Sequence, residues 1–164
     1  MLDEAAAALR TKGEYEAELS DAELGAMMRS IVESLIASQS VATARVVQAS
    51  ARILDGRGTG TGVVQVLKPV EATVQLVCTL RNSADPESIE LENLKVKQEG
   101  GFAAKLALKS VNLEGRAREA LADPNQALSA ALASQLQPRG ARLTSLATHF
   151  GDSTLHVRMR GGPA

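Results

Sequence analysis

The clearest pattern of apolar and polar positions lies between residues 20 and 38. Ser20 and Glu23 form a capping box, in which the serine hydroxyl accepts a hydrogen bond from the Glu23 amide and the glutamate reaches back. Behind this box, apolar side chains recur at helical spacing, namely Leu24, Met27, Met28, Ile31, Val32, Leu35 and Ile36. The spacing predicts an amphipathic helix over 21–38 whose apolar stripe faces a core.

After Ser40 the period of the apolar positions changes to two, which predicts β-strands. The alternating segments are 44–54, 59–66, 70–82 and 89–97. In the last of them the apolar phase slips by one residue at 92–93, which predicts a β-bulge. A further strand is expected over 102–111, because Phe102, Ala104, Leu106 and Leu108 alternate there with lysines and other residues.

Helices and a last hairpin are predicted around these strands. The segments are a helix at 3–11 ended by Gly13, a short strand at 14–19, helices at 112–122 and 124–137, and a hairpin that pairs 142–150 with 154–160. Asp123 is the expected N-cap of the 124–137 helix, with Pro124 at its first position. Leucines repeat every four residues along this helix and predict one apolar stripe.

Together these segments predict one α+β domain over residues 1–164. Its expected architecture is a curved antiparallel sheet of about six or seven strands, with amphipathic helices packed on one face. Short connections between the strands favour antiparallel pairing. Residues 1–13 are expected to form an N-terminal helix or tail, and residues 161–164 a flexible C-terminus.

The glycine-rich segment DGRGTGTG, residues 55–62, raises the question of a phosphate-binding loop. Dinucleotide-binding and P-loop segments join a strand to a helix, and a P-loop also needs a Lys followed by Ser or Thr. This segment lies between two predicted strands and contains no such pair. The Asp-Gly pair at 55–56 instead predicts a tight hairpin turn, followed by a strand with glycines on one face.

Gly60 and Gly62 place two positions without side chains on the same face of that strand. Glycine inside a strand costs roughly 0.5–1 kcal/mol relative to alanine, so a close neighbour is expected there. A packed helix, a strongly curled sheet or a ligand would each fit. Ala49 and Ala51 extend this small-residue patch, and the apolar stripe of the 21–38 helix would fill it well.

Composition argues against several classes of function. The chain has 18 basic and 19 acidic residues, and its net charge of −1 gives no general attraction to nucleic acid or to anionic membranes. Aromatic residues make up only 2%, too few for stacking on single-stranded nucleic acid. No apolar run is long enough to span a bilayer. We therefore expect no nucleic-acid partner, no membrane span, and a cytoplasmic location, or an envelope location if a leader has been removed.

Few residues are candidates for catalytic or metal chemistry. A two-residue turn at 152–153 would place His149 opposite His156, where the imidazoles either share a divalent metal or face solvent. Cys78 is the single cysteine, and its position on the apolar face of a strand predicts packing as a small hydrophobe. We predict no cofactor and no catalytic residue, and we expect that the chain is not an enzyme.

The start of the long helix carries a short motif found in a known group of proteins. The matching residues are Leu19, Ser20, Glu23 and Leu24. With the order of capped helix, long antiparallel strands, late helix and closing strands, the chain resembles the bacterial tubular lipid-binding (TULIP-like) families. The resemblance implies a curved sheet wrapped on helices and an apolar groove for a lipid tail, in proteins that usually work in or beyond the cell envelope.

The leading functional hypothesis is a non-catalytic protein that binds a lipid or another apolar ligand between helix and sheet. The residues expected to line the pocket are Met27, Met28, Ile31, Leu35, Val74, Leu76 and Leu106. The same residues would equally form a filled core. The alternative is a structural or interaction module that forms homo-oligomers through sheet edges or through the 124–137 helix. A hydrolase or metal enzyme is the third interpretation.

Overall fold

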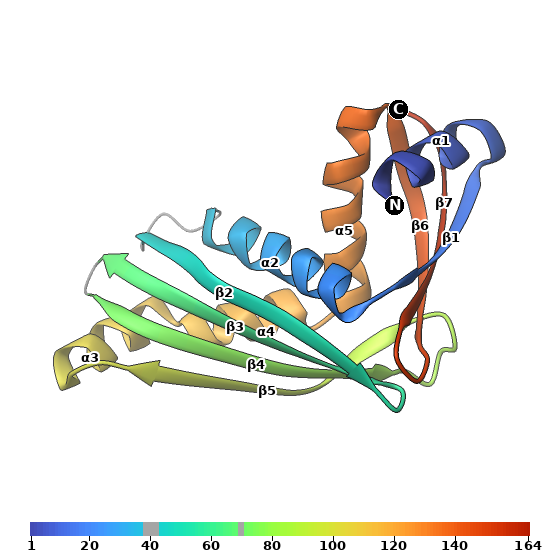
Figure 1. Cartoon of the computed structure of the whole chain (residues 1–164). Helices are drawn as coiled ribbons and strands as arrows, with labels where there is room; N and C mark the ends of the chain where they lie inside the picture. Colours follow the sequence, from blue (N-terminus) through green and yellow to red (C-terminus); the bar gives the residue numbers. More distant parts are fainter. Residues whose placement is uncertain (38–42, 69–70) are drawn as a thin grey trace.

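The computed structural model describes residues 1–37, 43–68 and 71–164, which form helices and strands in a mixed order (Figure 1). The chain begins with α1 (Leu2–Lys12), β1 (Glu14–Leu19) and α2 (Asp21–Ala37). Four long strands follow, β2 (Thr43–Leu54), β3 (Arg57–Lys68), β4 (Ala72–Asn82) and β5 (Ile89–Glu99). The chain ends with α3 (Phe102–Val111), α4 (Leu113–Leu121), α5 (Pro124–Leu136), the 3-10 helix η1 (Gln137–Arg139), β6 (Ala141–Phe150) and β7 (Leu155–Pro163).

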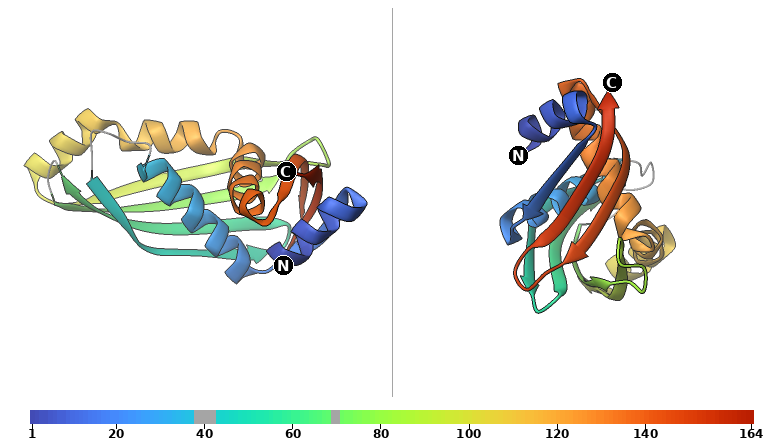
Figure 2. Two further views of the ribbon diagram at one scale, coloured as in Figure 1. Left: turned by 90° about the horizontal axis from the view of Figure 1, so that it is seen from above. Right: turned by 90° about the vertical axis from the view of Figure 1, so that its right-hand side faces the viewer.

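The strands form two antiparallel sheets. The long sheet has the order β2-β3-β4-β5, and the short sheet has the order β1-β7-β6 (Figures 1 and 2). The predicted α+β class and the antiparallel pairing are confirmed, and the described residues form seven strands, as expected, but in two sheets rather than the single sheet predicted. They divide between two sheets because the chain leaves the long sheet after β5, and the closing hairpin then pairs with β1 near the N-terminus.

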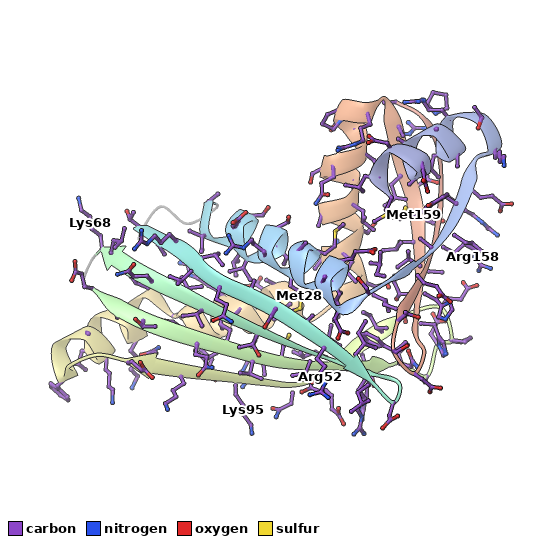
Figure 3. All side chains as sticks on the ribbon, in the orientation of Figure 1. Met28, Arg52, Lys68, Lys95, Arg158 and Met159 are labelled. Atoms are coloured by element: carbon purple, nitrogen blue, oxygen red, sulfur yellow. The ribbon has the colours of Figure 1, made fainter. Side chains whose placement is uncertain are left out.

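The main hydrophobic core lies where the two sheets, α1, α5 and the beginning of α2 meet. Leucines one turn apart on α5, Leu128, Leu132 and Leu136, are at most 3% exposed and belong to this core. On the short sheet, Met159 points inward to the helices and Arg158 points outward (Figure 3). The leucine stripe of α5 is thus buried within one chain, so an oligomer contact through this helix would have to use its other faces.

A side-chain interlock joins the two sheets at one end. The aromatic ring of Phe150, from β6, lies directly over Gly58 of β3. The side-chain amide of Asn82 donates a hydrogen bond to the Phe150 carbonyl oxygen (3.1 Å). Its oxygen accepts a hydrogen bond from the backbone N–H of Phe150 (2.7 Å). The two hairpin loops also meet, since the Asp55 and Gly56 amides donate to the carbonyl oxygens of residues 152 and 151. Hydrogen bonds and a buried ring therefore fix the angle between the sheets.

Several local predictions are confirmed by the backbone. Asp55 and Gly56 have φ values of 52° and 76°, as the predicted tight hairpin turn requires. Gly13 ends α1 in the left-handed region at φ 77°. In the β4–β5 pairing, Thr79 faces Asn93 and the next residue faces Leu91, so the bulge falls at Glu92. The cap of α5 is formed by the Asp123 carboxylate, which accepts from the Gln126 amide (3.0 Å).

The strand predicted over 102–111 is wrong, because this segment forms α3. Its alanines, leucines and lysines fit a helical period as well as an alternating one, and these residue types favour helices. Ala104 packs against Val66, Ala72 and Val74 at the end of the long sheet. Residues 161–163, expected to be flexible, continue β7 and pair with residues 141–143 of β6.

We predict that Gly58→Ala lowers the free energy of unfolding by about 1–3 kcal/mol, because the new methyl would lie 2.6 Å from the enclosed Phe150 ring. The matched control is Gly62→Ala, on the same face of the same strand, where the nearest atom to the methyl is the Gln48 carbonyl oxygen at 4.0 Å. The control should be neutral or stabilising by roughly 0.5–1 kcal/mol. Urea unfolding followed by circular dichroism measures both variants, and equal losses would contradict the interlock.

Candidate functional site

The candidate site lies on the face of the long sheet that carries helices. Seen from above, α2 crosses over the β2 side and α4 runs along the β5 side of the same face (Figure 2). Residues of α2, all four strands and α4 line a common apolar space between them. This position agrees with the prediction of an interface between the 21–38 helix and the sheet.

Two adjoining cavities of about 50 Å³ each occupy this space. The proximal cavity, nearer to Phe150, has Met28, Ile31, Gly60, Gly62, Cys78 and Leu121 in its lining. The distal cavity has Ile36, Ala44, Val64, Val66, Val74 and Arg116 in its lining. Val32, Leu35, Leu76 and Ala117 line both cavities. A thin wall of side chains therefore separates two parts of one apolar space.

The glycines of β3 shape the floor of the proximal cavity. The thioether of Met28 covers Gly60 so closely that a side chain at position 60 would overlap its sulfur and terminal methyl. Met28 reaches from α2 toward the long sheet in Figure 3. At Gly62, two residues further on, the nearest atom to an added side-chain carbon is the Gln48 carbonyl oxygen at 4.0 Å, so a small side chain would fit there. The helix thus packs on one glycine and leaves the other as cavity floor.

The two halves of α2 differ in how well they are packed. In the first half, Leu24 and Met27 are buried, at 1% and 5% exposure. In the second half, the four aliphatic residues that face the cavities remain half-buried: Ile31, Val32, Leu35 and Ile36. The helix therefore leaves the main core along its length and ends over a space that the described side chains do not fill.

Five of the seven residues predicted to line a pocket are brought together here: Met28, Ile31, Leu35, Val74 and Leu76. Met27 instead faces α5 in the main core, where the Gln135 side-chain amide donates to its sulfur (3.8 Å). Leu106 lies on α3 rather than on a strand, and it is 53% exposed and lines neither cavity. Its predicted place in the pocket followed from the wrong secondary structure.

The wall formed by α4 was missed by the sequence analysis. Ala117, Ala120 and Leu121 line the proximal cavity, and Ala117 with Arg116 lines the distal one. The signal that would have identified them is the spacing of Ala117, Ala120 and Leu121 at i, i+3 and i+4 within the predicted 112–122 helix, which places all three on one face.

The histidine pair lies on the outer face of the short sheet, away from these cavities. His149 faces His156 as predicted, and His156 Nε2 lies 3.3 Å from Glu18 Oε1. Both belong to an open, polar depression of about 730 Å³ that Glu16, Glu87 and Arg158 also line. Within the described ranges, no three His, Cys, Asp or Glu residues are arranged to hold a metal ion.

Cys78 lies in the proximal cavity, and thiol reagents can probe it there. Its thiol lines the cavity and is 3% exposed. Burial raises the pKa of this thiol above its usual value, and a hydrogen bond from the Gly60 backbone opposes that shift only in part. Because the chain has one cysteine, any thiol reagent that reacts with the protein reports on this cavity.

None of the described helices combines the length and apolar character needed to cross a membrane. No protein-family model matches the chain, and a search of curated proteins finds no match.

We predict that iodoacetamide alkylates Cys78 at least about ten-fold more slowly in the folded chain than in urea at pH 8, since both burial and the raised pKa reduce accessible thiolate. At about pH 9, where an exposed thiol is largely ionised, alkylation of the folded chain should still be slower than alkylation of the unfolded chain. Mass spectrometry of quenched samples measures the rate. Equal rates in the folded and unfolded chain would show that the thiol is not enclosed.

Proposed function

We propose that the protein is a non-catalytic binding protein for a lipid or another apolar ligand held between α2, the long sheet and α4. The observation that carries this proposal is the pair of adjoining apolar cavities beneath a half-buried helical stripe. Ligand-binding sites in proteins are concave, mostly apolar and provided with few polar groups. The resemblance to tubular lipid-binding proteins stays a prediction that agrees with this location.

The size of the cavities restricts the ligand and the way it binds. An engineered cavity of about 150 Å³ holds benzene, so neither cavity of about 50 Å³ accepts a ring without movement. A slender chain fits best, with the wall at Val32 and Leu35 displaced so that the two spaces join. The half-buried residues of α2 would then bury further apolar surface against the ligand, which contributes about 25 cal/mol per Å².

The proposal can be tested with a medium-length alcohol. The measured quantity is how far the alcohol protects Cys78 from alkylation by iodoacetamide. Decanol should slow alkylation of Cys78, because a ligand that binds only the closed, native state reduces exposure of the thiol by mass action. The variant Gly62→Val fills the floor of the proximal cavity and should reduce this protection by about ten-fold or more in apparent affinity. The unfolding free energy of the Gly62→Val variant should not fall below that of the unmodified chain, because valine is well suited to a strand interior.

The matched control is Thr59→Val, on the same strand but on its exposed, opposite face. This variant should bind decanol as the unmodified chain does. The proposal fails if decanol near its solubility limit gives the unmodified chain no protection. It also fails if Gly62→Val and Thr59→Val are protected equally.

A further inference from the structure

Among the described residues that line the two cavities, Arg116 is the one that carries a charge, and it lies at the distal cavity. Among the described residues, three arginines are half-buried: Arg29, Arg116 and Arg158. Arg29 pairs with Glu33 at 3.5 Å and Arg158 with Glu87 at 2.6 Å. In the part of the chain that the structure describes, the Arg116 side chain has no hydrogen bond and no ion pair.

The neighbouring Arg118 shows how differently an arginine on the same helix can be placed. It is exposed, pairs with Glu114 at 3.2 Å, and donates to the Leu94 carbonyl oxygen at 3.2 Å. Two residues away, Arg116 contributes to the lining of the distal cavity, and its side-chain donors have no partner among the described residues. A long cationic side chain packs its methylene stem on apolar surface and holds its head at the polar boundary.

An unpaired guanidinium at the boundary of an apolar chamber is suited to one kind of ligand. Partial burial without a counter-charge is unfavourable, and a carboxylate or phosphate accepts two parallel, charge-assisted hydrogen bonds from the planar guanidinium. None of the described residues that line either cavity is acidic, so this part of the chain offers no competitor there. The arrangement therefore favours an anionic head attached to an apolar tail.

We propose that the ligand is a single-chain anionic amphiphile whose headgroup is bound by Arg116. Its tail lies in the distal cavity and passes the shared wall of Val32, Leu35 and Leu76 to the proximal cavity. This inference rests on the proposed function and adds the charge of the ligand, the position of its head and the direction of its tail. A fatty carboxylate and an alkyl phosphate share this chemistry.

The test compares decanoate with decanol, which have tails of equal length but differ in charge. In the unmodified chain at about pH 7.5, where decanoate is ionised, decanoate should protect Cys78 with an apparent affinity about ten-fold above that of decanol. Arg116→Gln should remove this preference, so that decanoate and decanol protect Cys78 with equal apparent affinity in that variant. Arg118→Gln, the matched control, should keep the preference, and Arg116→Lys should keep part of it because it retains the charge. Decyl phosphate, measured in parallel, distinguishes the two headgroups.

The outcomes separate this inference from the proposed function. If decanol protects Cys78 but decanoate has no advantage, or keeps its advantage in Arg116→Gln, the role of Arg116 is wrong and the apolar site stands. If Arg118→Gln loses the preference as fully as Arg116→Gln, the effect is a general one of surface charge, and the assignment to Arg116 is again wrong. If neither compound protects the unmodified chain, the apolar site itself fails.

Discussion

The contact between the Phe150 ring and Gly58 is the constraint on which the arrangement of the other elements depends. A ring can lie this close to a strand only where the strand has no side chain, and Gly58 meets that condition. Asn82 then binds both backbone groups of Phe150, so the end of the short sheet is held against β4 as well as β3. With this corner fixed, the main core forms inside it, and the far end of the long sheet extends beyond the reach of α1, α5 and the short sheet (Figure 1).

The alternating glycines of β3 lead from this rigid corner to the cavities. Gly58 receives an aromatic ring, Gly60 receives the flexible thioether of Met28, and a side chain at Gly62 would meet only the Gln48 carbonyl oxygen, at 4.0 Å. The same strand face therefore passes from tight packing to open space within four residues. Methionine suits the middle position because its unbranched, polarisable side chain adapts to irregular gaps. A ligand that reaches the proximal cavity would contact this adaptable side chain.

The predictable parts of this fold are those decided by local chemistry. The capping box at Ser20, the turn at 55–56 and the bulge at Glu92 each depend on a few adjacent residues, and each is confirmed. Alternation alone could not distinguish strand from helix over 102–111, where alanine, leucine and lysine fit both periods. Met27 and Met28 share one apolar stripe, and only the path of α2 from the core to the cavities separates their roles. Pairing of β1 with β7 joins residues far apart in sequence, which no local pattern encodes.

The unfilled space is a property of particular side chains rather than of the architecture. At about 24 cal/mol per Å³, each cavity of about 50 Å³ lowers stability by about 1 kcal/mol, and a single larger residue at position 62 would remove much of one. The opposing α4 wall likewise presents Ala117 and Ala120 where longer aliphatic side chains would close the gap. Small residues on both sides, together with an unpaired arginine beside them, keep apolar volume and positive charge in one place. The proposed ligand, with an apolar tail and an anionic head, complements both.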